Sequence, residues 1–101
     1  MSVRFYSAAR IRLNQIWDYS LGQWGEDEAE SYVRGLFELI DSLDLLRHEW
    51  RPVKRERFKS VFFVRYRHHF VFFKELNSGA LGVITILHEK MDIPQRLRED
   101  S

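Results

Sequence analysis

The last third of the chain carries the pattern that most limits the possible folds. Two stretches rich in Val, Ile and Phe, residues 69–76 and 81–88, flank Asn77-Ser78-Gly79. Such side chains favour strands, and a short Asn- and Gly-containing connection favours a hairpin turn. A similar stretch, 60–66, comes before them, and residues 67–69 form the other connection although they contain no Gly. The sequence therefore predicts three strands joined by two turns.

The first half of the chain has helical periodicity instead. After a short strand at 3–6, Ser7 can cap a first helix, and Gly25 has the backbone freedom to end it. Acidic residues 26–28 then suit the first turn of a second helix, because negative charge is favourable there. Apolar side chains recur at three- and four-residue spacing in both segments, and the short connection predicts an antiparallel helical hairpin. The two stripes are Ala9, Leu13, Ile16, Trp17, Ser20 and Trp24, then Ala29, Tyr32, Val33, Leu36, Ile40 and Leu43.

The remaining segments complete the predicted order. Residues 47–59 contain Pro52 and six basic side chains, which predicts an exposed loop that includes Trp50. Asp92 can cap a short terminal helix with Pro94 in its first turn. The order is therefore β-α-α-β-β-β with a small final helix. We interpret Trp17 and Trp24 as core residues of the first helix.

Length and composition restrict the class of protein. The 101 residues suffice for a single domain spanning 1–101. The chain has no cysteine, which excludes disulfides and cysteine-bound metals and favours a reducing cytoplasm. Because the N-terminus lacks a signal-peptide pattern and no apolar run approaches about 18 residues, we expect neither export nor a membrane span.

Charge is distributed unevenly along the chain. Residues 1–46 hold four basic and eight acidic side chains. Residues 47–69 hold eight basic and two acidic side chains, and residues 70–101 hold four basic and five acidic ones. A basic middle segment suggests an anionic partner, either nucleic acid or an acidic peptide. The alternative is that this segment faces the acidic first half of the chain across the fold.

Most common catalytic motifs are missing from the sequence. The five glycines are scattered, so there is no glycine-rich phosphate loop. His68 and His69 are adjacent and would point to opposite faces of a strand, which makes them poor partners for one metal ion. Ser60 and Ser78 lack a neighbouring motif that would activate them. We expect no metal and no cofactor.

A basic and imidazole cluster remains as the candidate site. These side chains could converge if the strand ends meet, and they could then hold phosphate by charge-assisted hydrogen bonds. They could also cleave RNA without metal, with a cation stabilising the pentavalent charge while a histidine or tyrosine moves protons. The alternatives are solvated strand-end charges and, for His88, a structural ring bonded to a backbone carbonyl. The cluster comprises Arg57, Lys59, Arg65, Arg67, His68, His69, His88 and Lys90.

Three phenylalanines of the predicted strands have two possible roles. Phe62, Phe70 and Phe72 can belong to the core, or they can form a surface for a partner. A bare hydrophobic edge or face invites aggregation, so a partner chain that covers it would resolve the exposure.

The sequence resembles the ParE branch of the RelE/ParE superfamily, the toxins of bacterial type II toxin–antitoxin pairs. The resemblance covers nearly the whole chain. It includes Ser7-Ala8-Ala9 with Leu13, Ile16 and Tyr19; Trp24-Gly25 with Ala29, Tyr32 and Leu36; residues 68–72; and Ile86-Leu87-His88-Glu89-Lys90-Met91-Asp92 with Leu97. The terminal motif is the most specific part. Arg12 departs from the family, which usually has an acidic residue before the leucine.

The resemblance implies an α+β fold in which an antiparallel helical hairpin packs on a small, mostly antiparallel sheet. It also implies inhibition of DNA gyrase by binding rather than catalysis, a role in plasmid or chromosome maintenance, and a ParD-like antitoxin that joins the toxin in a hetero-oligomer. No membrane contact and no direct sequence-specific binding of nucleic acid are expected. Candidates for target contact are Arg57, Arg65, Arg67, His68, His69, His88, Lys90 and Arg96. Candidates for antitoxin contact are Leu13, Trp17, Trp24, Phe62, Phe70 and Phe72.

The alternative function is RelE-like cleavage of mRNA on the ribosome, with Arg65, Arg67 and His88 as its catalytic candidates. Here Glu89 follows His88 where such an enzyme would favour an aromatic residue, and no tyrosine occurs after Tyr66. A carboxylate beside the scissile phosphate would repel it. The sequence therefore favours gyrase binding over RNA cleavage.

Overall fold

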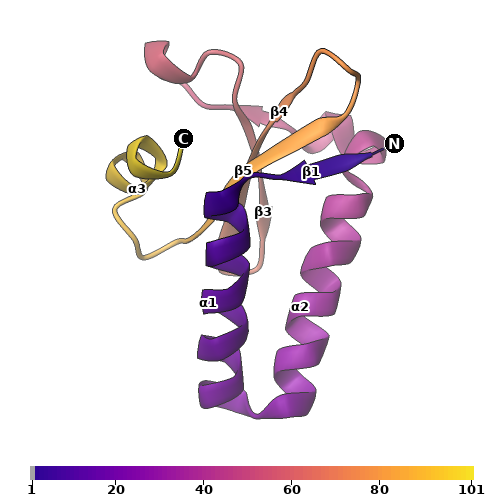
Figure 1. The fold of residues 1–101 in the computed structure, drawn as a ribbon, viewed down its shortest axis with the longest axis vertical. Helices are drawn as coiled ribbons and strands as arrows, with labels where there is room; N and C mark the ends of the chain where they lie inside the picture. The colour runs from indigo at the N-terminus through magenta and orange to yellow at the C-terminus, as the bar shows by residue number, and fades with distance from the viewer. Residues whose placement is uncertain (1) are drawn as a thin grey trace.

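The computed structural model describes residues 2–101 and has an α+β architecture, with a long helical hairpin packed on a five-stranded sheet (Figure 1). The predicted order and fold class are confirmed, and a two-residue strand and two 3-10 helices are added. The elements in chain order are β1 (Val3–Phe5), α1 (Ser7–Trp24), α2 (Glu26–Asp41), η1 (Leu43–Glu49), β2 (Arg51–Pro52), η2 (Glu56–Phe58), β3 (Phe62–Tyr66), β4 (His69–Glu75), β5 (Leu81–His88) and α3 (Ile93–Asp100). No helix within residues 2–101 has the length and apolar character needed to cross a membrane.

The sheet has the strand order β1-β5-β4-β3-β2 and is antiparallel except for the β1–β5 pair. Both predicted turns are present. Tyr66 pairs with His69, and His69 pairs with His88 on the next strand. The end of β3, the start of β4 and the end of β5 therefore meet at one end of the sheet.

The helical hairpin follows its predicted apolar pattern. Gly25, at φ 86°, separates the two helices. Four residues of the α2 stripe are buried: Ala29, Tyr32, Leu36 and Ile40. The predicted cap is wrong: Ser7 is the first helical residue, and Tyr6 occupies the N-cap position without a side-chain cap. The helix begins one residue earlier than predicted, because the Tyr6 carbonyl accepts a hydrogen bond from the Arg10 backbone N–H, at 3.1 Å.

Apolar side chains cover both faces of the sheet. One face packs against the hairpin through a cluster that includes Ile16, Leu36 and Phe73. On the other face Phe58 of η2 and Leu97 of α3 belong to a second cluster with residues of β4 and β5. The chain's own η2 and α3 therefore cover much of this second face. The sequence had left open whether the strand phenylalanines belong to the core or form a surface for a partner.

Two interpretations of tryptophans are wrong. Trp24 is 49% exposed at the end of α1, so it is not a core residue. Trp50 is part-buried rather than exposed: its indole N–H donates to the Leu43 carbonyl at 2.9 Å, and its ring packs edge-on against Phe73. The predicted loop around Trp50 is instead held by η1, β2 and η2, because its apolar residues, including Phe58, fold back onto the sheet.

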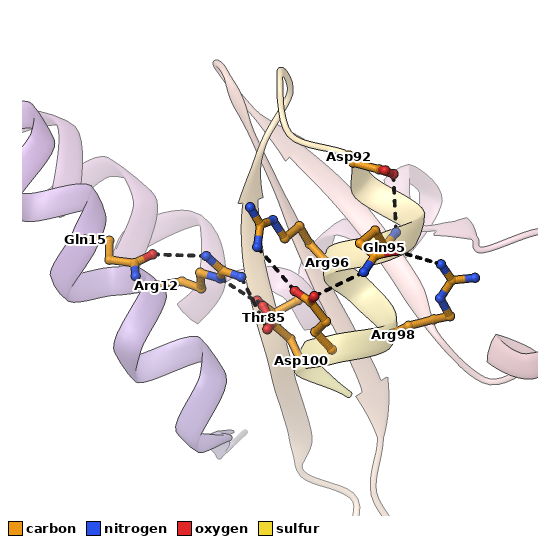
Figure 2. A network of polar contacts seen from close by, with 9 residues as sticks. Arg12, Gln15, Thr85, Asp92, Gln95, Arg96, Arg98 and Asp100 are labelled. Atoms are coloured by element: carbon orange, nitrogen blue, oxygen red, sulfur yellow. Dashed lines mark hydrogen bonds and ion pairs between the residues drawn. The ribbon is translucent and has the colours of Figure 1, made fainter.

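The terminal helix α3 is fixed at both ends. Asp92 caps it by accepting a hydrogen bond from the Gln95 backbone N–H, as predicted. At the other end Asp100 accepts hydrogen bonds from Arg12 of α1, at 2.8 Å, and from the buried Thr85 of β5, at 2.7 Å (Figure 2). The Arg12 and Asp100 side chains are only 14% and 12% exposed. This carboxylate therefore joins three elements.

We expect Asp100→Ala to destabilise the fold by about 3 kcal/mol, because removal of one partner leaves the other charge buried and unpaired. Glu99→Ala is the matched control, since Glu99 lies one residue earlier in α3 and forms an exposed pair with Arg96. Exposed pairs contribute less than about 1 kcal/mol. Urea unfolding of both variants measures the difference, and equal losses would contradict the role given to Asp100.

Candidate functional site

Charged and imidazole side chains gather where the β3–β4 turn meets the end of β5. The Glu89 backbone N–H donates to the His68 carbonyl at 2.8 Å, which ties the chain after β5 to the turn. The sheet register thus brings together residues that lie about twenty positions apart in the sequence. We call this group the turn cluster: Arg65, Arg67, His68, His69, His88 and Glu89.

Glu89 organises one side of the turn cluster. Its carboxylate contacts the His68 ring Nδ1 at 2.8 Å and accepts a hydrogen bond from the Arg65 guanidinium. The Arg65 Nε also donates to the Arg67 carbonyl at 2.9 Å. The hydrogen bond with His68, followed by that with Arg65, lowers the pKa of Glu89, so the carboxylate is charged at neutral pH. Arg65 and His68 are therefore already engaged by an anion from within the chain.

Arg67 lies at the tip of the turn and differs from Arg65. Within residues 2–101 its side chain forms no ion pair, and its guanidinium lies 5.6 Å from the Tyr32 ring centre and 6.0 Å from that of Tyr66. Its backbone has φ 50°, in the left-handed region that favours glycine. Strained positions of this kind concentrate at functional sites. The fold therefore holds a free cation on an aromatic platform.

The platform under Arg67 is fixed by a close contact with α2. The Tyr66 hydroxyl donates to the Tyr32 carbonyl at 2.8 Å, and the two rings pack edge-on at 5.1 Å. A Cβ at Gly35 would overlap the Tyr66 hydroxyl. The absence of a side chain at Gly35 thus allows β3 to approach α2 closely enough to position the turn.

Two histidines of the cluster have defined hydrogen-bond partners. His69 is 9% exposed, its Nδ1 lies 2.7 Å from the Tyr32 hydroxyl, and burial lowers its pKa to about 4. The His88 Nδ1 accepts a hydrogen bond from the Lys90 backbone N–H at 3.1 Å, so a neutral His88 carries its proton on Nε2. The ring of His88 is therefore bonded to a backbone amide, not to a carbonyl as one interpretation of the sequence had it.

His69 is expected to make stability depend on pH. Well above pH 6.5 the ring is neutral in both the folded and the unfolded state, so it contributes no pH dependence there. As the pH falls from 6.5 towards 4, the unfolded chain binds a proton that the folded protein excludes, so about 3 kcal/mol of stability is lost. Urea unfolding across this range should show the loss, and His69→Phe should remove it. His48→Gln, at an exposed position, should keep it; a His69→Phe variant with the original slope would contradict the assignment.

The structure does not bring together all the cations predicted to converge. Arg57 precedes β3 and lies at the opposite end of the sheet, where it lines a cavity with Tyr6 and Lys74. Lys59 lies in the same region and pairs with Glu56. This part of the prediction is wrong because β3 separates these residues from the turn by its whole length. Arg96 is also outside the cluster: it lies on α3 (Figure 2), and its side chain is 48% exposed.

The residues predicted to contact an antitoxin differ in exposure. Trp24 is exposed, whereas Phe72 is only 3% exposed within the second apolar cluster. The others are half-buried: Leu13, Trp17, Phe62 and Phe70. Their contact with an antitoxin stays a prediction.

Sequence reasoning missed the aromatic part of the site. The sequence places Tyr32 in the apolar stripe of α2 and in the family motif, and Tyr66 only at the end of a strand. Both positions follow the periodicity of their elements, so no local signal distinguished them. Within residues 2–101 the histidines and carboxylates form no group of three or more that could hold a metal ion.

The helical hairpin on a mostly antiparallel sheet is the arrangement that the resemblance to the RelE/ParE-type toxins implies. Residues 3–93 match the family model described as ParE toxin of type II toxin-antitoxin system, parDE. The chain therefore belongs to the ParE toxin family, and the resemblance seen in the sequence is confirmed.

Relatives and solved structures agree with this membership. The chain is 30% identical over 96 residues to Toxin ParE1 of two Mycobacterium tuberculosis strains, which covers 89% of this chain and 91% of the relative. A chain of the chromosomal ParDE TA system from P. aeruginosa has a TM-score of 0.71 at 17% identity, covering 87% of this chain and 95% of its own. A chain of the toxin-antitoxin complex RelBE2 from Mycobacterium tuberculosis has a TM-score of 0.63 at 16% identity, covering 86% and 95%. At these identities the structures support the fold alone.

Proposed function

We propose that this ParE-family toxin inhibits DNA gyrase by binding it, and that a cognate ParD-like antitoxin silences the toxin in a hetero-oligomer in the cytoplasm. The match to the ParE family over residues 3–93 supports the choice of target. The turn cluster, with Arg67 at its tip, is the candidate contact surface. Lys90, two residues after His88, extends this surface.

One observation carries the preference for binding over RNA cleavage. Glu89 occupies the anion-binding positions of Arg65 and His68. A scissile phosphate would have to displace this carboxylate, and the two anions would repel each other at short distance. His69 does not carry an acidic ring proton to donate near neutral pH, because burial lowers its pKa to about 4. The cluster is thus organised as a rigid charged surface.

The proposed antitoxin has chemistry that suits the toxin surface. Large apolar side chains of the helical hairpin remain exposed, among them Ile11, Tyr19, Leu21 and Trp24. An amphipathic segment of a partner chain would cover such residues, and acidic groups in it would meet the cations beside β5. A short upstream gene of about 80 codons with an acidic amphipathic second half would be the expected source.

A supercoiling assay tests the proposal directly. Purified toxin should block the supercoiling of relaxed plasmid by gyrase and should trap cleaved DNA, and the product of the adjacent gene should restore supercoiling. A toxin that leaves gyrase unaffected in stoichiometric excess would contradict the proposed target.

RNA cleavage is a second candidate because its three catalytic candidates all border the β3–β4 turn. The Arg65 Nε donates to the Arg67 carbonyl, and the His88 ring stacks with that of His68. Primer extension on translated messages would then show codon-linked cuts after toxin expression. His88→Ala and Arg65→Ala would remove these cuts. Intact messages in growth-arrested cells would dismiss this candidate.

A further inference from the structure

A second group of cations lies around η2, outside the turn cluster. Two cavities share the buried Phe58 of η2 in their lining. The first cavity, of about 190 Å³, is also lined by Arg57 and Lys74, and the second, of about 450 Å³, by Lys54 and Arg55. We call these four basic side chains the η2 patch. The turn cluster leaves them without a role, although three of them come from the basic segment that suggests an anionic partner.

The η2 patch has no anion of its own. Within residues 2–101 none of its four side chains forms an ion pair, because Glu56, which lies among them in the chain, pairs with Lys59. No acidic side chain lines either cavity. Ser101 lines the first cavity and forms no ion pair with the patch. Residues 51–60 hold five basic side chains and one acidic, so positive charge is in excess here.

The donors around η2 indicate which anion the patch suits. The first cavity is lined by Arg57, Lys74 and Ser60, and arginine, lysine and serine side chains are among those that contact the phosphate oxygens of DNA. Single strands are bound differently, by stacking of unpaired bases on open aromatic rings. Phe58 is only 5% exposed, and the Lys74 ammonium lies 5.6 Å from the centre of the half-buried Tyr6 ring. The patch therefore suits the backbone of a duplex better than a single strand.

The position of the η2 patch allows it to act separately from the turn cluster. Arg57 precedes β3 and Arg67 follows it, so the whole length of β3 lies between the two groups of cations. A protein bound at the turn cluster would leave the η2 patch free for a second contact. Gyrase acts on DNA, so a duplex would lie beside a toxin that is bound to this target.

We propose that the η2 patch binds the phosphate backbone of duplex DNA without sequence specificity. The choice of DNA over an acidic peptide rests on the proposed function, since the proposed target holds a duplex. The contact itself needs only the cations of the patch, so it can be measured on the toxin alone.

Two variants with the same change of net charge test the proposal. Arg55→Gln combined with Arg57→Gln removes two cations of the η2 patch, whereas Arg34→Glu makes an equal change on an exposed position of α2, which packs on the other face of the sheet. Binding to a short fluorescein-labelled duplex of mixed sequence is measured by anisotropy at several salt concentrations. Circular dichroism establishes that both variants are folded.

The salt dependence gives the expected result. Each phosphate contact contributes about one to the slope of log affinity against log salt concentration, so the double variant should lower this slope by about two and weaken binding about tenfold or more. Arg34→Glu should keep the slope and stay within about twofold of the unaltered toxin, because solvent ions screen a distant surface charge.

Three other outcomes would overturn the proposal. Equal losses in the double variant and in Arg34→Glu would mean that the duplex responds only to net charge. No binding of the duplex by the unaltered toxin at low salt would leave the patch without this ligand. Polyglutamate that displaces the duplex at an equal concentration of charge would assign the patch to an acidic protein instead.

The duplex assay and the supercoiling assay fail separately. The duplex assay contains no gyrase, so a negative result there leaves gyrase inhibition through the turn cluster unaffected. A toxin that binds the duplex through the η2 patch but does not inhibit supercoiling would contradict the proposed target and keep the DNA contact.

Discussion

Arg67→Glu is expected to weaken gyrase inhibition strongly while the protein stays folded. Arg67 is the cation of the turn cluster that no carboxylate within residues 2–101 engages, and its guanidinium is held over the rings of Tyr32 and Tyr66. The substitution removes the free cation proposed to contact gyrase and puts a negative charge in its place. We expect at least about a tenfold rise in the toxin needed for half-inhibition of supercoiling, the scale of a central interface residue.

Two variants isolate the cation from other effects. Arg4→Glu makes the same charge change on β1, at the opposite edge of the sheet, and should leave inhibition within about twofold if only the local charge matters. Arg67→Gly relieves the left-handed backbone at φ 50°, so stability should change by less than about 1 kcal/mol although inhibition is weakened. Full activity of Arg67→Gly would show that the turn cluster does not contact gyrase.

Gly35→Ala is expected to destabilise the protein by about 1–3 kcal/mol, against the usual trend for helices, because the new methyl group overpacks the contact with Tyr66. In an open helix the same change favours folding by up to about 1 kcal/mol. Gly22→Ala is the matched control, since nothing lies within 4 Å of a Cβ at that position of α1. The two variants should therefore shift stability in opposite directions.

Urea unfolding measures both glycine variants, and the supercoiling assay gives a second readout. A methyl group at position 35 would displace the Tyr66 hydroxyl from the Tyr32 carbonyl and so disturb the platform under Arg67. Gly35→Ala should accordingly weaken gyrase inhibition, whereas Gly22→Ala should not. If Gly35→Ala stabilises the protein instead, the Tyr66 side chain can move aside without loss of stability. The contact between Tyr66 and α2 would then not fix the position of the β3–β4 turn.

Local sequence patterns were sufficient to predict the structure where a residue acts on its neighbours in the chain. The Asn77-Ser78-Gly79 connection forms the predicted turn, with Gly79 at φ 88°, and Asp92 caps α3 through the backbone N–H three residues later. Both effects depend on neighbours in the chain, so the sequence contains the whole signal. The prediction that Ser7 caps α1 was wrong because the preference of serine for the cap position is only a tendency. The path of the chain out of β1 places Tyr6 at the cap instead.

Sequence patterns did not predict the exposure of a side chain where that exposure depends on which other element packs against it. Trp24 follows the stripe of α1 but lies at the end of the hairpin, beyond the sheet that would cover it, and is 49% exposed. Trp50 lies in a basic, proline-containing segment, yet it packs on Phe73 because η1 carries it back to the sheet. Neither environment can be read from a spacing of three or four residues.

The sequence by itself determined the order of helices and strands, both turns of the sheet, the cap of α3 and the family to which the chain belongs, because these depend on residues close together in the chain or on a motif that runs along it. Only the tertiary structure decided which cations meet. It excluded Arg57 from the turn cluster, placed Glu89 between Arg65 and His68, and set Arg67 on its aromatic platform. The physical reason is that strand register and the close approach of β3 to α2 are properties of the whole packed core, which no single segment specifies.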